Sequence, residues 1–366
     1  MPTPATIYCL TGFGRERGSL SSIFSPADRV PGDKSAGCMS DTFLALKSPM
    51  TLLFPPHRLG VRHDREGASV TSWLWAVFTV LAAGGQTLRN AMQRDLTVQI
   101  GTIGATHVRF LFGLPFALVF LAVVLTATGT SFPALSPRML AWTFAGAATQ
   151  IAATAMLLAA MRDKSFVLIT ALNKIEPVHV ALFGLIFLGD HLTLPLGIAI
   201  VVATLGVLIM SWPRGGAAEA LGVKPILLGL AAGAMFGASA VGYRGGILAL
   251  NHPNFVVGAT TTVVAGLTMQ VVFLTTYLAL FDRRTLNALI AAWRPSLFAG
   301  FMGAFASEMW FLAFALTTAA KVRTLALVEI FFAGLLSRNM FREGVASREG
   351  LGILLIVVGV IILLNI

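Results

Sequence analysis

The feature that most constrains this chain is a series of apolar segments of about 20 residues that starts at Trp73. A helix of about 20 apolar residues is long enough to cross the hydrocarbon core of a bilayer. Breaks with proline, glycine or charge separate the segments. The expected helices are 73–94, 103–127, 139–161, 166–188, 193–212, 225–248, 255–281, 295–316, 322–341 and 350–365. The pattern therefore predicts an all-α integral membrane protein of about ten transmembrane helices.

Composition supports this interpretation and excludes other classes of protein. The chain is 56% hydrophobic and only 11% charged, which is too little charge for a soluble protein of this size. The formal net charge of +10 could indicate a nucleic-acid partner, but the basic residues are scattered between apolar stretches. Both cysteines, Cys9 and Cys38, precede the apolar body, which therefore lacks a disulfide and a thiolate metal site. We expect no nucleic-acid partner, no metal and no cofactor.

Residues 1–70 differ from the rest of the chain. They carry 8 of the 26 lysines and arginines and have no long apolar run. Such a composition is typical of a disordered segment, and it lacks the continuous apolar core of a secretory signal. Either this stretch is a disordered extension, or it is mis-annotated and translation starts later, for example at Met50.

The apolar body contains an internal duplication. A pattern of one acid, a second acid and two glycines recurs 153 positions downstream (329 − 176 = 153). The first copy is Glu176, Asp190, Gly197 and Gly206, and the second is Glu329, Glu343, Gly350 and Gly359. Ten helices then divide into two halves of five, 72–217 and 218–366. Because five is odd, the halves must cross the membrane in opposite orientations, as two inverted five-helix repeats.

The residues at the end of each half resemble a known family. The first copy has Glu176-Pro177 in mid-helix, Phe187 to Asp190 at its end and Gly206-Val207 in the next helix; the second has Val328-Glu329, Phe341 to Glu343 and Gly359-Val360. This order resembles EamA-type repeats of the drug/metabolite transporter superfamily. The resemblance implies a secondary carrier in the inner membrane, often an exporter, with a central cavity between the halves. Two departures are Asp190, where the family usually has glutamate, and Lys174 beside Glu176.

Glu176 and Glu329 are the first candidates for a substrate or proton site. An ionised side chain in hydrocarbon costs roughly 2.5 kcal/mol or more and is normally kept where it faces protein or water. Asn173 and His179 fall on the same helical face as Glu176, and Pro177 removes a backbone donor beside it. The alternative is a structural pair between Glu176 and Lys174 or a neighbouring arginine.

Glu329 has no basic neighbour in the sequence, so we expect a lone carboxylate that can exchange a coupling proton. Glu308 is a third acid in mid-helix, with Trp310 two residues further on, and joins the candidate list. Arg89 and Arg244 could bind a substrate carboxylate or hold one of the glutamates. Arg244 follows Tyr243, and its alternative role is to reach the headgroups. Gln150 is either a substrate contact or an interhelical hydrogen bond.

The candidate substrate- and proton-binding set is Glu176, Glu329, Glu308, Asn173, His179, Gln150, Arg89, Arg244, Tyr243 and Trp310. The expected function is alternating-access transport of a small metabolite, amino acid or drug-like compound, and not enzyme catalysis, because no HExxH, DxxxD or P-loop pattern is present. An integral-membrane enzyme and a channel or scaffold are the alternatives. The expected partners are a small-molecule substrate and the lipid bilayer, with a homodimer left open.

Overall fold

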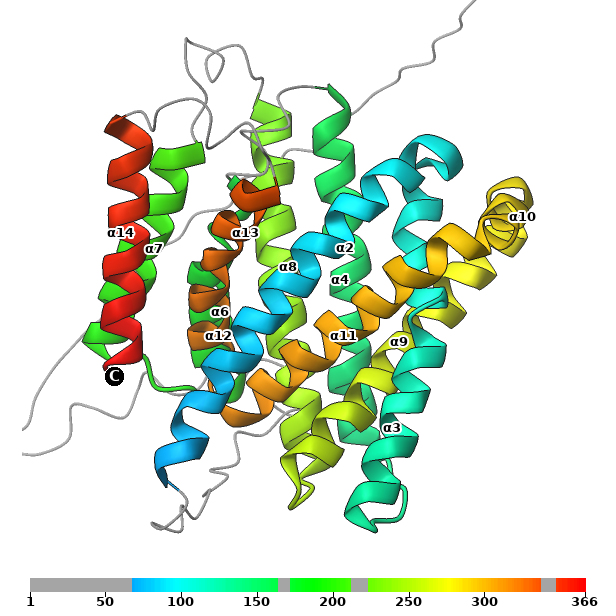
Figure 1. The fold of residues 1–366 in the computed structure, drawn as a ribbon, viewed down its shortest axis with the longest axis horizontal. Coiled ribbons are helices and arrows are strands. Elements are labelled where there is room, and N and C mark those ends of the chain that lie inside the picture. Colours follow the sequence, from blue (N-terminus) through cyan, green and yellow to red (C-terminus); the bar gives the residue numbers. More distant parts are fainter. Residues whose placement is uncertain (1–67, 164–171, 212–222, 337–346) are drawn as a thin grey trace, which may run out of the picture. The chain divides into compact units, whose positions relative to one another are not determined.

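The structure is a computed structural model that describes residues 68–163, 172–211, 223–336 and 347–366, all within one unit, Met50–Ile366. In these ranges the chain is helical and has no strand (Figure 1). Five segments are long and apolar enough to cross a membrane, namely Ile103–Thr128, Pro137–Leu157, Ile226–Leu250, Phe255–Phe281 and Ser296–Leu316. The shorter apolar helices are Glu176–Leu188, Leu194–Met210 and Glu349–Leu364. The all-helical prediction is confirmed for these residues, whereas ten helices in two inverted repeats stay a prediction.

The first two expected helices meet at a kink. Helix α2 spans Ala68–Leu111 and α3 spans Leu114–Thr128, and the kink inside α2, at Gly101, falls within the predicted break at 94–103. The apolar span Ile103–Thr128 matches the predicted helix 103–127. The backbone of α2 kinks at Gly101, with φ 71° and ψ 175°, a conformation that glycine reaches because it has no Cβ. Pro115 lies in the first turn of α3, where its missing N–H has no helical partner to lose.

Helices α4 (Pro137–Asp163) and α8 (Val223–Leu250) pack along each other. Glycines bring their backbones together: a Cβ added to Gly242 would lie 2.7 Å from the backbone nitrogen of Gly146. A Cβ added to Gly146 would in turn lie 2.9 Å from the ring of Tyr243. Small residues allow this close approach, which is typical of helix pairs in membranes.

The expected helix 166–188 is interrupted. Residues 164–171 lie outside the described ranges, Lys174 and Ile175 form a turn, and α6 begins at Glu176 (Glu176–Phe183). Pro177 therefore lies in the first turn of a helix and not in mid-helix, as the sequence had suggested. A single π-helical turn, η1 (Gly184–Leu188), follows and ends at Gly189 with φ 69°.

One glycine of each duplicated copy, Gly206 and Gly359, packs in a common interface, whereas Gly197 and Gly350 have no close neighbour among the described residues. Helices α7 (Leu194–Ser211) and α14 (Ser347–Leu364) lie side by side (Figure 1). A Cβ on Gly206 would meet the backbone of Gly352 and Ile356, and a Cβ on Gly359 would meet that of Ala199 and Ala203. The two contact sets are related by the same offset of 153 (352 − 199 = 356 − 203 = 153). Gly206 and Gly359 thus pack on the opposite helix in an equivalent way.

Helix α9 (Phe255–Phe281) begins at the cap residue Asn254, whose side chain accepts hydrogen bonds from the amides of Val256 and Val257. A short helix that the sequence did not predict, α10 (Arg283–Ala291), connects it to α11 (Trp293–Leu316). Helix α11 packs against α2, and the two cross in Figure 1.

The expected helix 322–341 is a chain of three elements. Helix α12 (Ala319–Leu325) is followed by a 3₁₀ turn, η2 (Ala326–Val328), and by α13 (Glu329–Leu336). The hydroxyl of Thr318 caps α12 by accepting a hydrogen bond from the amide of Lys321. Residues 337–346, including the duplicated Glu343, lie outside the described ranges, as does the predicted extension up to residue 67.

Candidate functional site

Glu176 is the first residue of α6 and pairs with an arginine of α12. Its Oε1 lies 3.1 Å from Nε of Arg323, and both side chains are mostly buried, at 15% and 13% exposure. This contact is an ion pair without the direction of a good hydrogen bond, since neither atom has a hydrogen-bond partner among the described residues. Arg323 is not in the candidate set predicted from the sequence, so its pairing with Glu176 is seen only in the structure.

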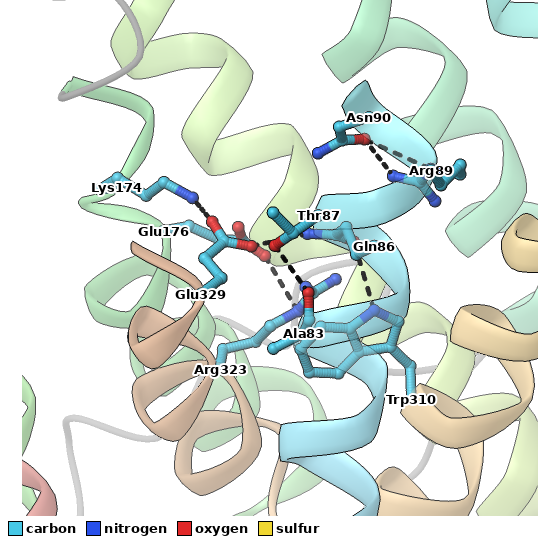
Figure 2. Close-up of polar contacts among 10 residues, drawn as sticks. All are labelled: Ala83, Gln86, Thr87, Arg89, Asn90, Lys174, Glu176, Trp310, Arg323 and Glu329. Atoms are coloured by element: carbon cyan, nitrogen blue, oxygen red, sulfur yellow. Dashed lines mark hydrogen bonds and ion pairs between the residues drawn. The ribbon is translucent and has the colours of Figure 1, made fainter. Parts of the chain in front are cut away.

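Glu329 is the first residue of α13 and has two partners from distant parts of the chain. Its Oε1 forms an ion pair with Nζ of Lys174, and its Oε2 accepts a 2.9 Å hydrogen bond from Nε2 of Gln86 (Figure 2). The prediction that Glu329 is a lone carboxylate is therefore wrong. The base comes from 155 positions away (329 − 174 = 155), in the turn before α6, where no local sequence pattern could reveal it.

The two ion pairs are reciprocal. Lys174 and Glu176 lie in the first half of the chain, while Arg323 and Glu329 lie in the second, and each duplicated glutamate takes its cation from the other half. Both glutamates also occupy the same local position, because each begins a helix directly after an interrupted turn.

Gln86 and Trp310 join the pairs into one group, which we call the charged cluster: Gln86, Lys174, Glu176, Trp310, Arg323 and Glu329. Nε1 of Trp310 donates a 3.3 Å hydrogen bond to Oε1 of Gln86. The guanidinium of Arg323 lies 4.7 Å from the centre of the Trp310 ring and 5.7 Å from that of Phe314. The cluster has two cations and two anions, so it is electrically balanced, and Trp310 offers Arg323 a cation–π contact.

The neighbouring candidates on the fourth expected helix do not form the predicted polar face. Asn173 precedes the turn at Lys174 and Ile175, so the helical period does not continue from Asn173 to Glu176. The backbone of Asn173 packs on Gly233, and the Cβ of His179 packs on Gly237. Oδ1 of Asn173 and Nδ1 of His179 are buried without a hydrogen-bond partner among the described residues.

Arg89 and Arg244 do not bind either glutamate. Arg89 is buried and directs Nε and Nη2 to Oδ1 of Asn90, at 3.3 and 2.8 Å (Figure 2). Arg244 binds Oδ1 of Asp190 at 2.5 Å through Nη1 and the carbonyl oxygen of Thr317 at 2.9 Å through Nε. Arg244 thus ties the end of η1 to the end of α11. Neither headgroup contact nor pairing with a glutamate describes this side chain.

A second polar group, which we call the amide network, connects α4, α8 and α9. The hydroxyl of Tyr243 donates to Oε1 of Gln150 at 2.9 Å, and Nε2 of Gln270 donates to the same oxygen at 2.6 Å and to the Tyr243 hydroxyl at 3.0 Å. The Tyr243 ring lies 4.7 Å from that of Phe311. Gln150 therefore makes the interhelical hydrogen bonds that were one of its two predicted roles.

Glu308 stands apart from both groups. Its side chain is 6% exposed, and Oε1 accepts a 2.5 Å hydrogen bond from the hydroxyl of Thr260. Oε2 is buried and has no hydrogen-bond partner in the described part of the chain. Unlike the two duplicated glutamates, this carboxyl group makes no ion pair with a cation of the described residues, so it is a second place where a proton could be held.

Residues that could hold a metal do not gather in the described ranges, which contain no group of three or more His, Cys, Asp or Glu side chains. Three residues of the charged cluster are outside the set predicted from the sequence, namely Lys174, Arg323 and Gln86. Lys174 was considered only as an alternative partner of Glu176. A signal for Arg323 existed: it is a charge six positions before Glu329 on an expected membrane helix (329 − 323 = 6).

Comparison with known proteins adds a family and a fold. Residues 223–365 match the EamA-like transporter family. Comparison with curated protein sequences gave no match. Among solved structures 27 chains are similar. One of them, described only as the crystal structure of a protein, covers 80% of this chain and 95% of its own with a TM-score of 0.57 and 14% identity. At that identity the likeness shows the fold alone.

Proposed function

Because residues 223–365 are an EamA-like domain of the drug/metabolite transporter superfamily, we propose that this multi-pass membrane protein is a secondary active carrier. It moves a small metabolite, an amino acid or a drug-like compound across the inner membrane by alternating access, as an exporter coupled to protons. The reciprocal pairing of Glu176 with Arg323 and of Glu329 with Lys174 is the observation on which the proposal rests.

The proposed architecture is two inverted repeats of five helices, 72–217 and 218–366. Equivalent contacts of Gly206 and Gly359 in the α7–α14 interface support it, since two copies related by a twofold axis make matching contacts. The shared position of Glu176 and Glu329 at the start of a helix supports it as well. In such carriers the substrate site lies where interrupted helices of the two repeats meet.

The charged cluster is the proposed substrate and proton site. A proton taken up on a carboxylate oxygen of Glu329 cancels its charge and leaves Lys174 without a partner. An unpaired buried charge costs roughly 3 kcal/mol or more, so an anionic group of the substrate that replaces the carboxylate offsets this cost. The same exchange is open to Glu176 and Arg323, with Trp310 as an apolar wall. Proton and substrate binding are thereby coupled.

Two other roles for the protein are integral-membrane catalysis and channel conduction. The EamA-like domain favours transport over both. Glu308 is the second candidate for the coupling proton, because its Oε2 has no partner among the described residues and Thr260 fixes its Oε1.

Uptake into proteoliposomes tests the proposal. A substrate is first found by thermal shift of the purified chain against a panel of metabolites, and its accumulation is then measured with and without a pH gradient. A carrier saturates with substrate concentration and responds to the gradient. Flux that does not saturate would identify a channel, and chemical conversion of the substrate would identify an enzyme; either result overturns the proposal.

A further inference from the structure

The corner formed by α9, α10 and α11 is rich in arginine, and these arginines take no part in the proposed transport mechanism. Residues 281–298 contain three arginines, Arg283, Arg284 and Arg294, and one acid, Asp282, for a net charge of +2 (3 − 1). Other described connections are different: 129–136 has no charged residue, 189–193 has Asp190 and His191, and 251–254 has only a histidine. Among the connections that the structure describes, basic charge is therefore highest at this corner.

The arginines of this corner are free to reach outward. All three side chains are exposed. Arg283 donates one hydrogen bond of 2.8 Å from Nε to the carbonyl oxygen of Ala279. The carboxylate oxygens of Asp282 accept hydrogen bonds from the amide of Thr285 at 3.1 Å and from its hydroxyl at 2.6 Å, and Arg284 adds an electrostatic contact. One acid balances only one of the three arginines, so the corner keeps an excess of guanidinium groups.

Apolar side chains surround these arginines. Phe281, Ile290 and Trp293 are 75%, 55% and 47% exposed. The guanidinium of Arg294 lies 5.3 Å from the centre of the Trp293 ring. The inner side of α10 is packed, since Leu289 is fully buried against α2 and α11 residues such as Val108 and Ala299. The outward face of this corner therefore carries both exposed apolar side chains and basic side chains.

The position of α10 places that face at a membrane surface. It connects Phe255–Phe281 to Ser296–Leu316, two helices that are long and apolar enough to cross a bilayer. A short helix between two such spans lies at the level of the headgroups, where tryptophan and arginine are favoured. Bidentate hydrogen bonds from guanidinium groups are well suited to a phosphate.

We propose that the outward face of the α9–α10–α11 corner binds an anionic phospholipid, with Arg283, Arg284 and Arg294 on its headgroup and Phe281, Ile290 and Trp293 beside its glycerol and acyl chains. The net positive charge selects an anionic over a zwitterionic lipid. Each basic residue near an anionic membrane surface contributes about fivefold in affinity, which corresponds to about 1 kcal/mol. The site is separate from the charged cluster and does not depend on the proposed transport function.

Native mass spectrometry of the full chain in detergent tests the site, with phosphatidylglycerol and phosphatidylcholine as probes. Phosphatidylglycerol should bind the unmodified protein at least about tenfold more tightly than phosphatidylcholine. The triple substitution R283Q/R284Q/R294Q should abolish this preference, whereas R283K/R284K/R294K should keep part of it. Asn287→Ala, on the same helix, should leave the preference unchanged. Equal binding of the two lipids, or a preference that survives the glutamine variant, overturns the proposal.

Two further measurements distinguish lipid binding from binding of free phosphate, and a lost site from a misfolded variant. Glycerol 3-phosphate should not compete with phosphatidylglycerol; competition at equal concentration would make this a site for soluble phosphate and overturn the lipid assignment. If the triple variant does not fold, Arg294→Gln alone, which lies outside α10, should lower the preference several-fold. An unchanged preference in that folded single variant contradicts the proposal.

Discussion

The charged cluster and the amide network connect helices in opposite ways. The amide network joins α4, α8 and α9, which are continuous helices, through neutral groups that satisfy one another. The charged cluster lies where helices are interrupted, before α6 and before α13, and its contacts are ionic. Neutral hydrogen bonds between continuous helices fix a scaffold, whereas balanced ion pairs at helix breaks can exchange partners without leaving a net charge.

The scaffold should be broken most severely by adding a methyl group between α4 and α8. In Gly242→Ala the new Cβ would lie 2.7 Å from the nitrogen and 2.8 Å from the Cα of Gly146, and backbone atoms cannot move without separating the helices. We expect a loss of about 3 kcal/mol in the free energy of unfolding, or no folded protein.

Thermal unfolding in detergent measures this effect, with Gly258→Ala as the matched control. The Cβ of that control would lie 3.7 Å from its nearest neighbour, His252, so it should not lower the unfolding temperature. Equal behaviour of the two alanine variants would show that α4 and α8 are not in close contact.

The cluster should respond strongly to loss of a cation. Arg323→Met removes the partner of Glu176 and the contact with Trp310, and it leaves a mostly buried carboxylate unpaired. We expect about 2 kcal/mol of destabilisation and loss of transport. The double substitution Arg323→Met with Glu176→Gln should recover stability but not transport. Recovery of both would make the pair structural only.

The amide network should tolerate removal of one hydroxyl. Tyr243→Phe deletes its bonds with Gln150 and Gln270 but keeps the bond between the two amides and the ring contact with Phe311. We expect a loss of about 1 kcal/mol in unfolding free energy and transport within about twofold of the original. A complete loss of transport in a folded variant would move this network from scaffold to substrate site.

The smallest effect should come from the cap of α10, which belongs to neither region. A hydrogen bond from the Thr285 hydroxyl, with a second from its amide, holds the pKa of Asp282 below its ordinary value of 3.8. A depressed pKa gives stabilisation that is present above the ordinary value and is lost as pH falls through the folded-state pKa. The difference in unfolding temperature between the original chain and Asp282→Ala should therefore be constant at neutral pH and shrink below about pH 3.8. A difference that grows in acid would contradict this.

Continuous helices could be predicted from the sequence, and their interruptions could not. The predicted helix 255–281 coincides with α9, and 295–316 lies within α11, because long apolar runs decide such elements. The sequence did not predict α10, because a segment of nine residues that begins with two arginines is typical of a loop between two membrane helices. The break at 94–103 was predicted, but not that it is a kink at Gly101 within one long helix, because glycine permits such a conformation and does not require it.

The acidic residues of the candidate site could be predicted from the sequence, but their partners could not. The duplication drew attention to Glu176 and Glu329, and the structure brings both into one cluster. Lys174 was compared with Glu176, its neighbour in sequence, yet it binds Glu329. Pairing across the two halves depends on how α6 packs against α12, which is a tertiary contact that no local spacing encodes.

The most direct test of the account is gradient-driven accumulation of substrate by Glu329→Gln in proteoliposomes. This variant keeps an acceptor for Gln86 but cannot carry the charge that pairs with Lys174. The account predicts accumulation at the level of empty liposomes, with normal insertion, and no rescue when Lys174→Gln is added to remove the unpaired cation. Accumulation at the level of the unmodified protein would contradict it, and the coupling proton would then belong elsewhere, with Glu308 the first residue to test.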